Sequence, residues 1–286
     1  MTTDVHPAFS LAAETLDNED FLRLAAFIES YCGIKMPETK RSMMEGRLRK
    51  RLRDLGMRGF SEYCYHLFDG GGLEEEVVYL IDAITTNKTD FFREPKHFTH
   101  LVEKALPSLR ADGIDYPLRV WSAASSIGAE AYTIAMILDD YARSVPGFSF
   151  DIIGTDICTE VLDQACQAIY PLSMIETVPD QWRARYFMRS IAGTQPTIRV
   201  RPNVRSSVRF GRLNLMENFY PLDYKMDVIF CRNILIYFGR ATQEAVLMKI
   251  CQNLRSGGYL YIGHGESVTG MTLPLAPVSP SVFRRI

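Results

Sequence analysis

The N-terminal part of the chain places apolar side chains at helical spacing. Phe21, Leu24 and Ile28 recur at i, i+3 and i+7, so they fall on one face of a helix, and Asp17 stands where it can cap the start of that helix. Further helices are predicted over residues 38–55, 61–68 and 73–85. Because no β alternation interrupts these helices, residues 1–90 are predicted to form a small all-helical domain.

From Pro117 onward, short apolar strands alternate with helical patterns. The strands are predicted over residues 118–124, 150–157, 226–231 and 258–262, and the helices over residues 129–141, 159–168 and 241–254. Strands that alternate with helices imply a parallel sheet with helices on both faces. We therefore expect an α/β, Rossmann-like domain over residues 91–286.

This alternation breaks between Ile169 and Arg209. Residues 197–201 and 207–210 alternate polar and apolar side chains, as half-exposed antiparallel strands do. The pattern predicts a small antiparallel β insertion at about residues 170–206.

Composition and charge narrow the classes of protein. The 286 residues include 47% hydrophobic and 23% charged side chains, as in an ordinary globular protein, and the formal net charge of −2 argues against nucleic acid or an anionic membrane as the partner. The six cysteines are scattered without a CxxC pair, so we expect buried thiols and no metal. No apolar run reaches the length of a bilayer and no signal pattern opens the chain, so a cytoplasmic protein without membrane insertion is expected.

The segment 87–94 is the richest in candidate chemistry. It combines Phe91 and Phe92 with Asn87, Thr89 and Arg93. These polar side chains suit a binding site better than a core, because arginine offers a fork of donors for a carboxylate and Asn and Thr offer short hydrogen bonds. The alternative is a turn that caps the following helix.

Polar residues also stand at four predicted strand ends. The first strand opens through small residues into a helix with Glu130 in its first turn, and Asp156 closes the second strand, where Rossmann-like units bind ribose hydroxyls. The other two strand ends are followed by Asn214-Leu215 and Arg232-Asn233. Each of the four strand ends alone is explained by a helix cap or a turn, and the GxGxxG fingerprint of dinucleotide-binding domains is absent. Together they indicate a ligand crevice at the carboxyl ends of the strands.

These motifs resemble those of the bacterial chemotaxis receptor methyltransferases (CheR), S-adenosylmethionine enzymes that esterify receptor glutamates. The likeness spans nearly the whole chain. It rests on Asn-x-Thr-x-Phe-Phe-Arg-Glu at 87–94, Trp-Ser-Ala-Ala at 121–124, Tyr-Phe at 186–187, Cys-Arg-Asn at 231–233, Tyr-Phe at 237–238 and Gly-His-Gly-Glu at 263–266.

The resemblance implies roles for individual residues and segments. Arg93 and Tyr237 would face the substrate carboxylate as the catalytic pair, and the β insertion would dock receptor tails. Nine residues would bind S-adenosylmethionine: Asn87, Thr89, Arg93, Glu130, Asp156, Asn214, Leu215, Arg232 and Asn233. Methyl transfer to a glutamate that is already ionised at pH 7 needs alignment and exclusion of water more than acid–base help.

The predicted helix at 40–55 carries a strong positive charge. Seven Lys and Arg residues there oppose only Glu45 and Asp54. A solvated amphipathic face is the ordinary explanation, but a glutamate-rich receptor helical bundle is an acidic partner that such a helix would fit. The residues predicted to dock this substrate on a monomeric enzyme are Arg47, Arg49, Lys50 and Arg53.

Two other functions remain open from the sequence. A non-catalytic module that binds S-adenosylmethionine or S-adenosylhomocysteine is one, because Ala129 and Ala131 stand where the family usually has Glu and Pro. A methyltransferase for a different substrate is the other. It explains the cofactor motifs but not the 87–94 segment, and the basic helix lacks the interleaved aromatics that stack on nucleic-acid bases.

Overall fold

The computed structural model describes residues 15–114, 116–176, 178–190 and 196–286. They form two compact units, divided between Thr86 and Asn87. The sequence predicts the boundary after residue 90. The structure begins the second unit at Asn87 because the backbone of this segment bonds to that unit: the Ser126 hydroxyl donates to the Asn87 carbonyl, at 2.9 Å, and the Phe92 N–H donates to Thr133 Oγ1, at 3.1 Å.

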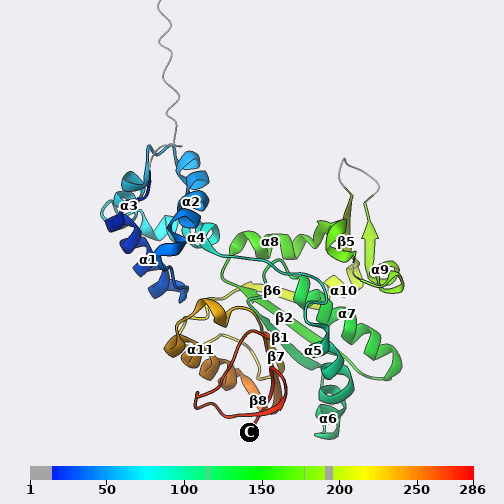
Figure 1. Cartoon of the computed structure of the whole chain (residues 1–286). Helices are drawn as coiled ribbons and strands as arrows, with labels where there is room; N and C mark the ends of the chain where they lie inside the picture. Colours follow the sequence, from blue (N-terminus) through cyan, green and yellow to red (C-terminus); the bar gives the residue numbers. More distant parts are fainter. Residues whose placement is uncertain (1–14, 115, 177, 191–195) are drawn as a thin grey trace, which may run out of the picture. The chain divides into compact units, whose positions relative to one another are not determined.

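Helices make up the described part of the first unit, as predicted. They are α1 (Asn18–Cys32), η1 (Glu38–Lys40), α2 (Arg41–Leu55), α3 (Phe60–Phe68) and α4 (Leu73–Ile84) (Figure 1). The Asp17 carboxylate accepts the Asp20 N–H at 2.8 Å and so caps α1. Gly33 and Gly56 end α1 and α2 in the left-handed conformation, where glycine carries no Cβ penalty.

A seven-stranded sheet forms the centre of the second unit. Its order is β6 (Val208–Arg212), β2 (Phe150–Asp156), β1 (Leu118–Ala123), β7 (Met226–Cys231), β8 (Leu254–Ile262), β10 (Val282–Arg285) and β9 (Leu275–Ser279). The strands from β6 to β8 are parallel, whereas β10 and β9 form an antiparallel hairpin at one edge. The predicted parallel α/β sheet is therefore confirmed.

Two parts of this sheet differ from the prediction. The antiparallel pairing expected for residues 207–210 is wrong, because β6 pairs parallel with β2, with Val208 opposite Ile152. Successive side chains of a strand point to opposite faces of the sheet, so a strand with one partly exposed face, such as β6, alternates polar and apolar residues whichever way it pairs. The β9–β10 hairpin is not predicted by the apolar pattern. Pro277 lies in β9, an edge strand, where the sheet tolerates a residue without an N–H.

Both faces of the sheet are covered. One core cluster joins Val120, Ile152 and Phe230 of the strands to Leu101 and Ile134 of the helices. The alternate strand residues are buried too, as Trp121, Ile229 and Leu260 show at 0% exposure, which is typical of a sheet between two helical layers. The helical segments of this part are α5 (Pro95–His100), η2 (Leu101–Ala105), α6 (Leu106–Ala111), α7 (Ala129–Ser144), α8 (Thr159–Gln167), η4 (Leu235–Tyr237) and α11 (Arg240–Asn253). No helix among the described residues is both long and apolar enough to cross a bilayer.

The insertion forms the predicted small antiparallel sheet. Its strand order is β3 (Ile169–Pro171), β5 (Thr197–Val200) and β4 (Phe187–Arg189), and its helical turns are η3 (Leu172–Ile175), α9 (Asp180–Tyr186) and α10 (Pro202–Arg205) (Figure 1). Buried Tyr170 and Tyr186 belong to the same core cluster as α7. The insertion is therefore packed onto the second unit through a shared core.

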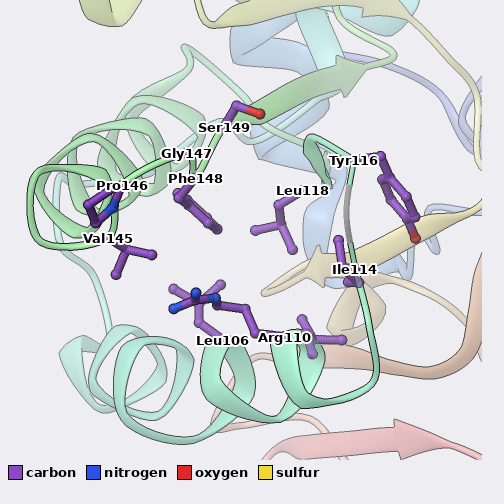
Figure 2. A pocket seen from close by; sticks show the side chains of 11 residues that line it. Leu106, Arg110, Ile114, Tyr116, Leu118, Val145, Pro146, Gly147, Phe148 and Ser149 are labelled. Carbon is purple, nitrogen blue, oxygen red and sulfur yellow. The ribbon is translucent and has the colours of Figure 1, made fainter.

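A cavity of about 160 Å³ opens at the amino ends of β1 and β2. Figure 2 shows Leu106 and Arg110 of α6 on one side of it and Leu118 and Phe148 on the other. Ligands of open α/β sheets bind at the opposite edge, beyond the carboxyl ends of the strands. This cavity is therefore separate from the predicted crevice.

A buried ion pair connects three helices of the first unit. The Arg51 guanidinium of α2 donates two hydrogen bonds to the Glu76 carboxylate of α4, at 2.7 and 2.6 Å, and the Tyr63 hydroxyl of α3 donates a third at 3.0 Å. The Glu76 side chain is only 3% exposed. Water does not take the place of a lost partner at such a buried site. Removal of the Glu76 charge is therefore costly.

We predict that Glu76→Gln lowers the stability of the chain by roughly 3 kcal/mol, because it leaves the Arg51 guanidinium without its counter-charge. The shift in the denaturation midpoint of the first unit measures this loss. Glu75→Gln is the matched control, since Glu75 is its exposed neighbour on the same helix. Equal midpoints for the two variants would contradict the prediction.

Candidate active site

The parallel strands end at a common level. Ala123 of β1 lies opposite Thr155 of β2 and Cys231 of β7, and Cys231 lies opposite Ile262 of β8. On the other side, Asp156 lies opposite Arg212 of β6. Segments that follow these strands therefore meet at one edge of the sheet. They include predicted site residues from four different parts of the sequence: Glu130, Asp156, Asn214, Leu215, Arg232 and Asn233.

Asp156 fixes the loop between β1 and α7. Its carboxylate accepts the Ser126 N–H at 2.8 Å and the Cys158 N–H at 3.0 Å. In the same loop Ala124, Ser126 and Gly128 have φ values of 57°, 51° and 85°, a left-handed backbone that is unfavourable for Ala and Ser. Each carboxylate oxygen has a second lone pair, so Asp156 can still accept hydrogen bonds from ribose hydroxyls.

Glu130 presents a largely buried carboxylate at the start of α7. The Ser122 hydroxyl donates to its Oε1 at 2.7 Å, and Arg232 Nε lies 3.4 Å from its Oε2. Burial raises the pKa of Glu130, and the Arg232 charge and the Ser122 hydrogen bond only partly oppose this rise. A further positive group beside Glu130 would stabilise its ionised form. The site therefore suits a ligand ammonium.

The predicted 87–94 segment forms a turn held by aromatic packing. The Phe91 ring is 3% exposed and lies 5.1 Å from the Tyr170 ring and 5.2 Å from the Phe187 ring, both in the insertion. The Phe92 ring meets Trp182 at 5.5 Å. The two phenylalanines therefore anchor the turn and leave its polar side chains for other contacts.

Hydrogen bonds connect this turn to neighbouring loops. The Asn87 side chain donates to Cys158 Sγ at 3.5 Å, beside the loop that Asp156 holds. Arg93 Nη1 donates to the Lys88 carbonyl at 3.1 Å. Lys88 thus contributes through its backbone, while its side chain is exposed; Thr89, between Asn87 and Arg93, is half-buried.

Arg232 lies at the centre of the site. Its side chain is 1% exposed, its Nη2 donates to the Arg93 carbonyl at 2.6 Å, and its Nε lies 3.4 Å from Glu94 Oε2 as well as from Glu130. Burial raises the pKa of Glu94, but Arg232 and hydrogen bonds from the Asn233 amide and the His264 N–H outweigh it and leave that pKa lowered. Glu94 is therefore an ionised partner of Arg232.

The Glu266 carboxylate likewise connects the segments that follow β7 and β8. Its carboxylate accepts the N–H groups of Gly263, Asn233 and Leu235, at 2.6, 3.0 and 2.7 Å. Burial raises its pKa against the lowering effect of these bonds. No role is predicted from the sequence for Glu94, Glu266 or Ser122. All three lie inside the motifs that carry the family resemblance, but a motif does not show which of its side chains points into the site.

The remaining predicted residues lie on short turns at the same edge. Asn214 Oδ1 accepts the Met216 N–H at 2.9 Å, and the carbonyl of buried Leu215 accepts from the Tyr220 hydroxyl at 2.9 Å. Tyr237 ends η4, the turn that follows Asn233, and is half-buried. These contacts fix the backbone of the turns. The choice of ligand then depends on the side chains at this edge.

Glu94, His97 and His264 bring possible metal ligands within 4.8 Å of one another. The Arg232 cation already lies beside the Glu94 carboxylate, which disfavours a metal ion there. Both ring nitrogens of His97 are buried without a hydrogen-bond partner in the part of the chain that the structure describes. Burial lowers the pKa of His97 to about 4, helped by Arg232 and the two neighbouring histidines and opposed by Glu94.

Fold and site together define the second unit as a Rossmann-like, S-adenosylmethionine-dependent methyltransferase domain. Residues 87–282 match the family "CheR methyltransferase, SAM binding domain", and residues 19–85 match "CheR methyltransferase, all-alpha domain". The chain belongs to the CheR methyltransferase family.

Three relatives support this assignment, each named chemotaxis protein methyltransferase. The protein of Salmonella typhimurium is 39% identical over 256 residues, covering 90% of this chain and 86% of the relative. That of Borreliella burgdorferi is 34% identical over 274 residues, covering 94% and 95%. That of Escherichia coli is 37% identical over 252 residues, covering 88% and 85%. The predicted family, enzyme class and cofactor are confirmed, and the chain is a methyltransferase of chemotaxis; the roles of individual residues stay predictions.

The residues present fit S-adenosylmethionine. The under-compensated carboxylate of Glu130 suits its ammonium, and Asp156 keeps acceptor capacity for its ribose. Leu215, 7% exposed, offers an apolar surface for the adenine. The ammonium, the ribose and the adenine of the cofactor thus each have a chemically suitable residue at the carboxyl edge of the sheet.

We predict that His97 makes the chain sensitive to acid. Its folded pKa of about 4 lies below the ordinary value of 6.5, so unfolding takes up a proton and stability falls as the pH drops from 6.5 toward 4. Between pH 6.5 and 5 this single group accounts for roughly 2 kcal/mol. His97→Gln should lose that part of the pH dependence in denaturant titrations, whereas His66→Gln, in the first unit, should keep it. An unchanged slope in His97→Gln would exclude this role.

Proposed function

We propose that this enzyme transfers the methyl group of S-adenosylmethionine to glutamate side chains of chemoreceptors, which gives methyl esters and adjusts chemotactic signalling. One observation carries the proposal: Arg232 bonds the Arg93 turn and at the same time lies beside Glu130, the carboxylate that fits the cofactor ammonium. A cation able to bind a substrate carboxylate is thereby connected to the cofactor crevice.

The chemistry requires orientation more than proton transfer. S-adenosylmethionine supplies a methyl group that is activated by the positive sulfur. A glutamate with an ordinary pKa of about 4.3 is ionised at neutral pH, so no general base is needed. Arg93 orients the incoming carboxylate and Tyr237 supports it. The rate enhancement comes from aligning the carboxylate oxygen with the methyl group and from excluding water.

The cofactor contacts in this proposal come from both sides of the crevice. Glu130 binds the methionine part and Asp156 the ribose. The segments that flank the rest of the cofactor contribute Asn87, Thr89, Arg93, Asn214, Leu215, Arg232 and Asn233.

Two surfaces serve the receptor in this proposal, with the enzyme acting as a monomer in the cytoplasm. On α2, Arg47 donates to the Thr85 carbonyl at 2.9 Å and Arg49 lies over the Phe60 ring at 5.4 Å, so both have structural partners. Lys50 and Arg53 are exposed, and they carry the docking of the acidic helical bundle. The edge strands β3 and β4 of the insertion are suited to pair with an extended receptor tail.

Arg93→Ala should cut methyl transfer about 100-fold, because the substrate carboxylate loses its orienting partner. Labelled methyl transfer to a receptor fragment measures the rate, a thermal melt checks that the variant folds, and calorimetry with S-adenosylhomocysteine separates a lost cofactor contact from a lost substrate contact. Lys88→Ala is the control, since it keeps the carbonyl that Arg93 bonds. Near-normal turnover of Arg93→Ala would remove Arg93 from the mechanism.

Charge reversal on α2 should weaken receptor docking. Lys50→Glu and Arg53→Glu are each expected to raise the KM for the receptor about 10-fold at low salt with little change in kcat, and the effect should shrink as salt screens the charges. Lys35→Glu reverses an exposed charge of the same unit outside α2 and should have little effect. If all three variants behave alike, α2 is not the docking surface.

A further inference from the structure

Arg232 makes contacts that a cofactor-binding role does not explain. Its guanidinium reaches the backbone of Arg93, 139 residues away in the sequence, and lies between two carboxylates. We propose that Arg232 is a positioning residue: its side chain holds the Arg93 turn in its working conformation and affects methyl transfer through Arg93. This inference rests on the proposed role of Arg93.

The turn needs an external constraint because its backbone is strained. Phe92 and Glu94, on either side of Arg93, have φ values of 57° and 56°, which non-glycine residues adopt only where the surroundings enforce them. The aromatic contacts of Phe91 hold the first half of the turn. The bond from Arg232 Nη2 to the Arg93 carbonyl holds the second half.

The guanidinium is itself fixed on several sides. Its carbon lies 5.4 Å from the centre of the Phe98 ring and 5.9 Å from that of Phe230. Its partner Glu94 is held by the Asn233 amide at 3.2 Å and by the His264 N–H at 3.3 Å. Because the plane of its guanidinium is fixed, Arg232 can hold the Arg93 turn in a defined position relative to β7, the strand that it follows.

The geometry also explains why arginine rather than lysine suits this place. The planar fork presents Nη2 to the carbonyl while Nε stays near both carboxylates. A lysine ammonium is a compact point charge, so it can neutralise the carboxylates or reach the carbonyl but not do both with the same geometry. Substitution by lysine thus separates the charge of Arg232 from its positioning role.

Arg232→Lys should lower kcat for receptor methylation about 10-fold or more, while the Kd for S-adenosylhomocysteine changes less than about 3-fold because the lysine keeps the positive charge beside the cofactor site. The KM for the receptor should change little, and a thermal melt checks that the variant folds. A wild-type kcat would overturn the proposal, since charge alone would then suffice. A Kd that weakens as much as kcat falls would overturn it too, since the loss would then lie in cofactor binding and not in the position of Arg93.

A double-mutant cycle with Arg93→Ala tests the route of the effect. If Arg232 acts through Arg93, adding Arg232→Lys to Arg93→Ala should cause no further loss of kcat. If Arg93→Ala is impaired and the kcat losses of the two single variants multiply in the double variant, only the positioning role is overturned. A near-normal Arg93→Ala would instead overturn the proposed mechanism, and the positioning role with it. If Arg232→Lys does not fold, Glu94→Gln takes its place in the cycle, with the same non-additivity expected, because it removes the partner that holds Arg232.

Discussion

The attraction between the Arg232 guanidinium and the carboxylates of Glu94 and Glu130 is the interaction on which the site depends. Its three members come from the segment after β7, the entrance to α5 and the start of α7. A charge buried in this way must be compensated, because desolvation is costly for either sign. The chain therefore cannot move one of these segments alone, and the cofactor crevice and the Arg93 turn keep a common geometry.

The other loops of the crevice follow the same physical rule. Asp156 and Glu266 lie at strand ends, and each carboxylate accepts several backbone N–H groups. Carboxylates that bond backbone donors can hold a strained turn without a glycine-rich sequence. The chain lacks the GxGxxG fingerprint, and these carboxylates hold the loops at the carboxyl edge of the sheet instead. Ala129 and Ala131 are both fully buried in α7, so their methyl groups serve packing there.

Sequence patterns predict what depends on local spacing and miss what depends on distant partners. The i, i+3 repeat of Phe21 and Leu24 predicts the helical unit because a helix is a local structure. The direction of β6 and the contacts of Glu94 are set by segments far away in the chain, which no local pattern contains. The basic residues of α2 show the same limit: their charge is visible in the sequence, but the internal bonds of Arg47 are not.

Charge balance connects the neutral His97 to the chemistry of the ligand. Glu94 and Glu130 both lie beside the buried Arg232 guanidinium, and burial raises the pKa of Glu130 because Arg232 and the Ser122 hydrogen bond only partly offset the desolvation of its carboxylate. A protonated His97 would add a second cation beside Glu94, but its burial lowers its pKa to about 4 and keeps it neutral at physiological pH. S-adenosylmethionine has an ammonium, a sulfonium and one carboxylate, so its net charge is +1, and its proposed binding beside Glu130 would favour the ionised form of that carboxylate. In the proposed mechanism, the Arg93 charge then serves the carboxylate of the substrate.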